Sequence, residues 1–428
     1  MDIIHARCAG LDVHKDSVVA CLRVATGATI GREVRTFATT TSDLLALSAW
    51  LTQHECTQVA LEATGVYWKP VWHILSESPF ELILANAAHI KNVPGRKTDV
   101  NDATWIADLL AHGLIRASFV PEPPIQELRS LLRTRTQLVR EQARHVQRLQ
   151  KTLEEANIKL DSVISDLLGR SGRAILAALI AGETDPAQLA RLADRRLKAP
   201  RAVLCAALRG RVTAHHRFLL RLHLEQIEAL TAALAALDRE VEAASARLEA
   251  ATPADQTPFR DLITRLDGIP GINALGAQMI LSEIGRDMRR FASAAHLVSW
   301  AGLCPCNQES AGKRRSTRLR QGAPWLKTLL IQCAWGAQRK TGSYFQAQFR
   351  RLRSRRGPKK AICAVAASIL TAIYHMLKTG TSYQELGAGY FERRSPQART
   401  RRLVAQLTDL GFDVQLTPST APAAAVSH

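Results

Sequence analysis

Long apolar runs are missing from this 428-residue sequence, since no stretch approaches the ~20 uninterrupted apolar residues that a membrane-spanning helix requires. The N-terminal sequence MDIIHARCAGLDVHKD carries charges where a signal peptide would have an apolar segment. The two absences argue against a membrane protein and against a secreted protein. We therefore expect a cytoplasmic protein.

Cysteine pairs at the spacing of zinc ligands are also missing. The eight cysteines are scattered along the chain, and only Cys304 and Cys306 lie close together. A structural zinc site would need a second such pair, and scattered cysteines are typical of a reduced intracellular protein. With 46% hydrophobic residues, the chain instead predicts globular cores in two or three domains.

Acidic residues are nearly absent from residues 311–402, which hold 21 Lys and Arg against two Asp and Glu. The resulting charge of +19 equals the net charge of the whole chain. Aromatic residues are interleaved with this positive charge, namely Trp325, Trp335, Tyr344, Phe345 and Phe349. Such a one-sided basic surface predicts a nucleic-acid partner, and an anionic membrane surface is the simpler rival.

The first 120 residues alternate short apolar runs with helical patterns. Residues 11–30 predict two strands that turn at Thr26-Gly27, and residues 59–63 and 81–86 predict further strands. Residues 41–53 and 101–112 predict helices. The pattern indicates a layered α/β domain over residues 1–120, which the proline-rich sequence PEPP at 121–124 closes.

Residues 121–260 carry apolar residues at seven-residue spacing in two runs. The first run comprises Ile125, Leu132, Val139, Val146, Leu153 and Leu160, and the second comprises Leu220, Ile227, Leu234, Val241 and Leu248. This spacing predicts coiled-coil helices. Pairing within one chain and pairing between chains fit equally well, and the second would give a homo-oligomer, a dimer or tetramer. Residues 170–215 between the runs look helical and suggest no function.

Residues 261–380 predict a mainly helical domain. Its first part, residues 261–302, contains the turn Ile269-Pro270-Gly271-Ile272 between helices and is similar to a helix-hairpin-helix, whose exposed amides can hold a phosphate. A glycine-containing turn between helices is the simpler interpretation. Residues 359–378 predict an apolar-faced core helix, and residues 381–428 predict a basic and then disordered tail.

Four acidic residues suggest a metal-dependent site. Asp12 interrupts the first strand, Glu62 ends a later one, and Asp99 and Asp102 are spaced to share one face of a helix start. A carboxylate in an apolar strand is costly unless it is paired or bound to metal. Hard oxygen ligands select Mg²⁺ or Mn²⁺, which can stabilise the attacking and leaving oxygens of a phosphodiester. Singly, each acid fits a solvated or capping role, with Asp102 as a helix N-cap, but together they predict a nuclease-like site.

A serine beside a basic run suggests a second site. Ser310 lies in a polar segment before five basic residues, which are Lys313, Arg314, Arg315, Arg318 and Arg320. A positioned serine can attack a phosphate when cations meet the charge of the transition state. A loop serine beside arginines more commonly contacts a phosphate or lies inert on the surface. The residues alone leave both interpretations open, and the basic run predicts nucleic-acid binding in either.

Six strings occur in order over residues 8–380: GLDVHKDSV, LEATGVYW, NVPGRKTDVNDA, LDGIPGINALGAQMILSEIG, FASAAHLVSWAGLCP and QESAGKRR. Through them the chain resembles the bacterial insertion sequence 110 family of transposases. The resemblance implies an RNase H-like (RuvC-like) N-terminal domain in which Asp12, Glu62, Asp99 and Asp102 bind Mg²⁺ (or Mn²⁺). It also implies a C-terminal transposase domain with Ser310 as the nucleophile, a composite site shared between subunits, and a structured guide (bridge) RNA besides the DNA.

The chain departs from this family in three places. Ser310-Ala311-Gly312 replaces a Ser-Gly pair of many relatives, a GAPW sequence follows the basic run, and residues 170–215 lengthen the middle region. The first departure leaves the geometry of the serine segment open. Two other functions also remain, a RuvC-like nuclease that needs only the carboxylates and a nucleic-acid-binding protein without catalysis. Four intact acids weigh against the last.

Overall fold

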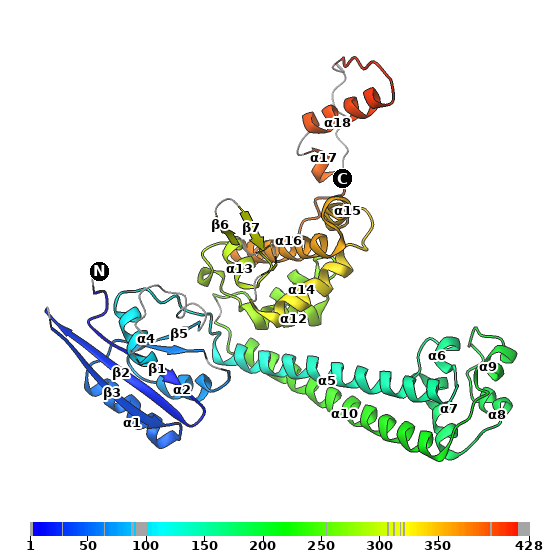
Figure 1. Ribbon diagram of the computed structural model, residues 1–428, viewed down its shortest axis with the longest axis horizontal. Helices are drawn as coiled ribbons and strands as arrows, with labels where there is room; N and C mark the ends of the chain where they lie inside the picture. The colour runs from blue at the N-terminus through cyan, green and yellow to red at the C-terminus, as the bar shows by residue number, and fades with distance from the viewer. Residues whose placement is uncertain are drawn as a thin grey trace. The chain divides into compact units, whose positions relative to one another are not determined.

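The computed structural model describes residues 3–27, 29–63, 65–86, 90, 101–253, 255–305, 308–310, 313–316, 318–319, 322–393 and 396–417. The chain divides into two compact units, Met1–Val120 and Pro121–His428. Figure 1 shows a sheet-containing first unit and a helical second one. Each unit has its own hydrophobic core.

The first unit is built on a mixed five-stranded sheet with the order β3-β2-β1-β4-β5. Its strands are β1 (Arg7–Val13), β2 (Ser17–Thr26), β3 (Thr29–Ala38), β4 (Gln58–Glu62) and β5 (Glu81–Ala85). Strands β1, β2 and β3 pair antiparallel, whereas β4 pairs parallel with both β1 and β5. The expected α/β domain is confirmed, as are the expected helices, now α1 (Thr41–Gln53) and α4 (Asp102–Ala111).

Two details of this unit differ from expectation. Residues 11–30 contain parts of three strands rather than two, because the chain also turns at the exposed residues His14, Lys15 and Asp16 between β1 and β2. The expected turn after Thr26 is present and joins β2 to β3. Helix α2 (Trp68–Leu75) was not expected, since its aromatic-rich sequence, WKPVWHIL, is short and carries a proline.

Helices cover both faces of the sheet. On one face α1 and α2 pack against strand residues that include Leu11 and Leu61. On the other face α4 packs against Cys8 and Ala60. Gly10 makes this approach possible, because a Cβ atom there would lie 2.3 Å from the Ala103 carbonyl oxygen. Helix α4 therefore lies directly on β1.

The second unit starts with an arm made of two long helices, α5 (Pro123–Glu155) and α10 (Ala214–Ala250) (Figure 1). The helices run antiparallel, because Arg247 binds Glu127 near one end while Gln142 donates a hydrogen bond to Thr231 farther along. The expected pair of heptad helices is confirmed. The observed pairing lies within one chain, one of the two arrangements that the sequence left open.

In two places the heptad pattern predicts buried residues between the helices that the structure does not show. Leu160 lies outside α5, since Asn157 adopts a left-handed conformation (φ 56°) just after the helix ends. Val139 is 40% exposed rather than buried, and Val146 is only partly buried. Val139 lies in the middle of the arm, where two helices alone leave it exposed, whereas Val146 packs against the hydrophobic core at the far end of the arm.

Two histidines face each other across the arm and make it sensitive to acid. The Nδ1 atoms of His145 on α5 and His223 on α10 are 3.3 Å apart, so one neutral ring donates to the other. Burial lowers the pKa of His223, and the nearby His145 and Arg148 lower it further. The folded arm therefore binds this proton more weakly than the unfolded chain does, and stability is lost as the pH falls through the ordinary pKa, about 6.5.

We predict that the arm melts at a lower temperature at pH 5 than at pH 7.5, because burial and the nearby Arg148 disfavour a positive charge on His223 in the folded arm. Circular dichroism melts of the whole protein would measure this. Replacing His223→Gln should flatten the pH dependence, whereas His215→Gln, an exposed histidine at the start of α10, should leave it unchanged. Equal pH dependence in all three proteins would contradict the prediction.

The far end of the arm carries a small helical tip, which we define as residues 156–221. It contains α6 (Leu160–Val163), α7 (Arg170–Ala181), α8 (Pro186–Arg191), α9 (Arg201–Ala207) and the start of α10. Leu160, Ile175, Leu189 and Leu204 of these helices share one core with Leu153 at the end of α5. The tip is therefore a folded structure with its own core rather than a loop.

The rest of the second unit is mainly helical. It contains α11 (Phe259–Asp267), α12 (Ala274–Ile284), the 3-10 helix η1 (Met288–Arg290), α13 (Ala294–Trp300), β6 (Gln308–Ser310), β7 (Lys313–Ser316), α14 (Pro324–Ala337), α15 (Tyr344–Arg356), α16 (Pro358–Thr379), α17 (Tyr390–Arg393) and α18 (Pro396–Asp409). Among the described residues, α16 alone is long and apolar enough to span a membrane; it packs against α13, α14 and α15 as the expected core helix. Helix α18 lies in the expected tail, and residues 418–428 lie outside the described residues.

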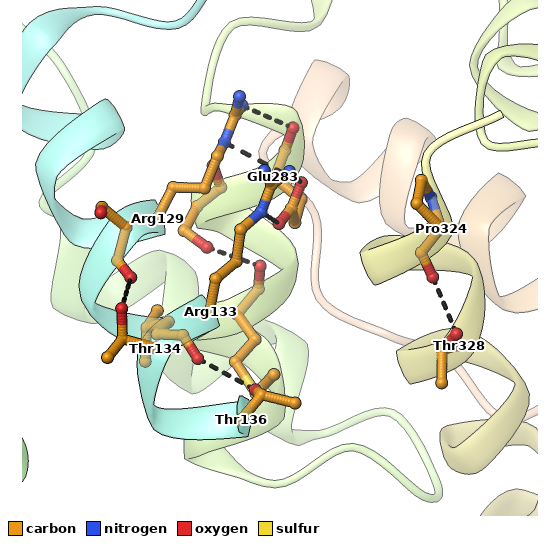
Figure 2. A network of polar contacts seen from close by, with 11 residues as sticks. Arg129, Arg133, Thr134, Thr136, Glu283, Pro324 and Thr328 are labelled. Atoms are coloured by element: carbon orange, nitrogen blue, oxygen red, sulfur yellow. Dashed lines mark hydrogen bonds and ion pairs between the residues drawn. The ribbon is translucent and has the colours of Figure 1, made fainter. Parts of the chain in front are cut away.

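An ion-pair network joins the base of the arm to α12 (Figure 2). Arg129 donates to the carbonyl oxygens of Ser282 and Glu283 at 2.8 and 2.9 Å. Arg133 binds both carboxylate oxygens of Glu283 at 2.7 Å. Burial lowers the pKa of Arg129 to about 10, so its guanidinium stays charged at neutral pH. The guanidinium of Arg133 also lies over the ring of Trp325, at the start of α14.

Candidate active site

Asp12 and Glu62 lie on the same face of neighbouring parallel strands. Gly10 pairs with Ala60 across β1 and β4, and Asp12 and Glu62 follow these residues by two positions. Side chains two residues apart point to the same side of a strand. Gly10 and Ala60 both face α4, so the two carboxylates belong to that face as well.

Helix α4 brings its first turn toward these carboxylates. Cys8 contacts Ala107, and Gly10 contacts Ala103. Strand β1 and helix α4 therefore run in opposite directions. Asp12, near the end of β1, consequently lies toward the start of α4, where Asp102 is found. Asp102 is the first residue of α4 rather than its N-cap, because the side chain of Asn101 accepts the capping hydrogen bond. Asp99 lies outside the described residues.

The two strand carboxylates differ in their surroundings. Glu62 is only 9% exposed, although it terminates a strand. Asp12 forms a 3.1 Å contact with Nε2 of His14, which the sequence analysis missed. The spacing Asp12-x-His14 was the available signal, since residues two apart share a strand face.

The described carboxylates form only part of a binding site for a hard cation such as Mg²⁺. Among the described residues, no three His, Cys, Asp or Glu side chains come together as a metal-binding group. The buried thiols of Cys8 and Cys56 offer no alternative: they lie near the starts of β1 and β4, away from Asp12 and Glu62, and burial raises the pKa of Cys8 to about 12 and that of Cys56 to about 11. Both therefore remain protonated, and a protonated thiol is a poor metal ligand. Carboxylates on one face are nevertheless donors of the kind that Mg²⁺ prefers.

Ser310 lies at the end of a β-hairpin, not in an irregular polar loop. It is the last residue of β6 and pairs with Lys313, the first residue of β7. Glu309 pairs with Arg314, and the register shifts between Gln308 and Glu309. A two-residue connection that contains glycine is a strong hairpin signal, so the sequence Ser310-Ala311-Gly312-Lys313 could have revealed this structure.

The base of the hairpin is held by a close backbone contact. Pro305 and Leu319 form an isolated antiparallel bridge beyond the strands. A Cβ atom on Gly322 would lie 2.5 Å from the amide nitrogen of Gly302, and Gly322 has a φ of 145°. Glycine is therefore required at Gly322. The ends of α13 and α14 fix the hairpin that bears Ser310.

The structure describes some of the residues expected to bind nucleic acid more fully than others. Arg318 is exposed. Lys313, Arg314 and Arg315 are described as β7 backbone, and Arg320 lies outside the described residues.

The expected turn at Ile269-Pro270-Gly271-Ile272 lies between α11 and α12. Gly271 has a φ of 85°, and a Cβ atom there would lie 2.2 Å from the carbonyl oxygen of Cys333 on α14. The turn thus packs tightly against α14. The Asn273 side chain also accepts a hydrogen bond from the amide of Gly276 at 2.9 Å. Packing and a helix cap account for this turn, and phosphate binding there stays a prediction.

Comparison with known proteins identifies two matching family models. Residues 9–158 match a transposase model of the Asp-Glu-Asp-Asp class named for insertion sequence 110. Residues 263–350 match the transposase model of the IS116/IS110/IS902 family. Together the two matches cover more than half of the chain.

Two curated proteins are also similar. A Sinorhizobium fredii protein named as a transposase, y4pF/y4sB, is 30% identical over 126 residues, which are 28% of this chain and 32% of that protein. The chain thus spans about a third of that relative's length. A 43.6 kDa protein of the insertion element IS110 from Streptomyces coelicolor is 26% identical over 312 residues, 68% of this chain and 73% of that protein.

Proposed function

Since this chain belongs to the IS116/IS110/IS902 family of transposases, we propose that it cuts and rejoins DNA through a carboxylate site and a serine nucleophile. The observation that carries the carboxylate part is the shared face of Asp12 and Glu62 beside the start of α4. The antiparallel β1–β3 meander followed by parallel β4 and β5 supports an RNase H-like (RuvC-like) class for this unit.

The proposed roles combine these positions with the roles that the family resemblance implies. Asp12, Glu62, Asp99 and Asp102 would hold Mg²⁺ or Mn²⁺, which supplies Lewis-acid stabilisation of the phosphate oxygens. Ser310 Oγ attacks the phosphorus, the P–Oγ bond forms, and the bond to one strand end breaks, so that this end leaves as a hydroxyl. Attack by another DNA hydroxyl then restores the serine and rejoins the DNA. The basic residues of β7 and Arg318 neutralise the phosphate during both steps.

Guidance by a structured RNA and assembly of a composite site from two subunits are further parts of the proposal. The acids lie in the first unit and Ser310 in the second. This separation allows one subunit to supply the acids and another the serine. The half-covered middle of the arm offers a surface for such an assembly, because Val139 is 40% exposed there.

We predict that Val139→Asp dissociates a homo-oligomer without unfolding the chain, because an exposed valine contributes little to the arm itself but would be buried between subunits. Light scattering should show a fall to the monomer mass. Thr134→Asp, at another exposed position of α5, is the matched control and should retain the larger mass. A monomeric unmodified protein, with and without nucleic acid, would refute this assembly.

The DNA around the gene tests the function as a whole. An active transposase of this kind should lie inside an element with defined ends and a structured non-coding segment. The purified protein, Mg²⁺ and a transcript of that segment should recombine a plasmid that carries the element ends, as measured by sequencing the junctions. Failure to produce junctions with intact ends would argue against the proposal.

A further inference from the structure

The tip, residues 156–221, lies almost wholly between the two segments that match transposase models, 9–158 and 263–350. It contains twelve Lys and Arg against five Asp and Glu. The whole-chain charge conceals this excess, because the sum over residues outside 311–402 is zero. The tip is thus a second basic region, on a separate core from the serine-bearing one.

Most acidic side chains of the tip bind backbone amides rather than its basic side chains. Each of four carboxylates accepts at least one backbone N–H, and these are Asp166, Glu183, Asp185 and Asp194. A carboxylate used in this way fixes a turn or a helix N-terminus. The negative charge of the tip therefore has a structural use.

The basic side chains lack such partners. Seven exposed ones form no ion pair within the part of the chain that the structure describes: Arg195, Arg196, Lys198, Arg201, Arg209, Arg211 and Arg221. Among the described residues, three basic side chains of the tip bind carboxylates: Arg170 and Arg173, at 3.8 and 3.0 Å, and Lys159, which pairs with Glu154 of α5. The unpaired charge consequently faces solvent.

The segment that carries three of these side chains is held in place from within. Ala193 and Leu197 pack against the tip core. The amide of Asp194 donates to Ser171 Oγ at 2.9 Å, and the amide of Leu197 donates to the carbonyl oxygen of Asp194 at 3.0 Å. With these residues turned inward, the exposed Arg195, Arg196 and Lys198 lie on the outer side. The basic surface is fixed before any partner arrives, which lowers the entropy cost of binding.

We propose that this surface of the tip binds the phosphodiester backbone of a nucleic acid. Six of the seven unpaired side chains are arginines, whose planar donors match phosphate oxygens. Helix α5 has 33 residues and is about 50 Å long, the length of about 15 base pairs of duplex DNA, so the tip can bind phosphates that lie far from the base of the arm. The inference rests on the proposed function in one respect, namely that the protein acts on nucleic acid.

Salt-dependent binding by the full-length protein tests this site. The triple variant Arg195→Gln, Arg196→Gln, Lys198→Gln removes charge at exposed positions, so the melting temperature should not change. Fluorescence anisotropy would follow a labelled 40-base-pair DNA duplex and the RNA duplex of the same sequence. The plot of log affinity against log salt should lose about one unit of slope per phosphate contact, about three in all. Contacts elsewhere on the protein add a constant slope and cancel in the comparison.

Two control variants isolate the tip. Arg195→Lys with Arg196→Lys keeps the charge and should retain the slope, whereas Arg144→Gln with Arg148→Gln removes exposed charge from the shaft of α5 and should retain it as well. A change with DNA alone or with RNA alone identifies the partner. An unchanged slope with both duplexes overturns the proposal, as does binding of the tip only to vesicles of anionic lipid. Neither result bears on Ser310, whose adduct is a separate measurement.

Discussion

Replacing Ser310→Ala should abolish the covalent protein-DNA adduct and lower the recombination rate by at least about a thousandfold. The physical reason is the loss of the attacking oxygen, because alanine has no atom that can form the ester with phosphorus. Ser310 pairs with Lys313 in the hairpin backbone through main-chain atoms, so the substitution leaves that pairing intact. Denaturing gels of protein trapped on labelled DNA, followed by peptide mapping, would measure the adduct.

Ser316→Ala is the matched control, since Ser316 lies at the other end of the same hairpin and pairs with Gln308. It should form the adduct at the unmodified rate. If Ser310→Ala recombines as fast as the unmodified protein and no adduct forms, the serine is an ordinary strand residue. The protein would then be a carboxylate-only nuclease, the second function that the sequence allowed.

Asp12→Asn and Glu62→Gln should each lower strand cleavage by at least about a thousandfold and leave nucleic-acid binding nearly unchanged. Both substitutions keep the shape of the side chain and remove the charge that would bind Mg²⁺. Because Glu62 is only 9% exposed, the melting temperature of the Glu62→Gln variant must be measured together with its cleavage activity. Glu55→Gln removes an exposed acid of the same unit and should cleave normally.

Chelation provides an independent measure of the carboxylate site. EDTA should stop cleavage by the unmodified protein, and added Mg²⁺ or Mn²⁺ should restore it. Cleavage that continues in EDTA, or that survives Asp12→Asn, would remove the four acids from the mechanism. Loss of DNA binding in parallel with cleavage would instead assign them a structural role.

The parts of the fold that follow a local period were predictable from sequence. The apolar spacing of α5 and α10 identified two long helices, and short apolar runs identified β4 and β5. Asp12 and Glu62 stood out because an acid in an apolar strand contradicts its surroundings. The strand register then placed both on one face, as their role would require.

Features that depend on distant contacts were not predictable in this way. The heptad period included Val139 among buried positions, although burial there needs a third helix that the middle of the arm lacks. The hairpin at Ser310 depends on the approach of Gly302 to Gly322, residues on either side of it. The basic tip was not predicted, because acidic residues elsewhere outside residues 311–402 offset its positive charge.

The antiparallel arm restricts how this chain can change in length. In two antiparallel helices, the residue number rises along one helix as it falls along the other. The numbers of contacting residues, such as Glu127 with Arg247 or Gln142 with Thr231, therefore always add up to about 373. An insertion in α5 alone would shift every pair beyond it, whereas equal insertions in both helices would preserve the seam. Each paired insertion of seven residues would extend the arm by about 10.5 Å. Evolution or design can therefore set the reach of the tip in heptad steps, through two insertions at matching positions in α5 and α10.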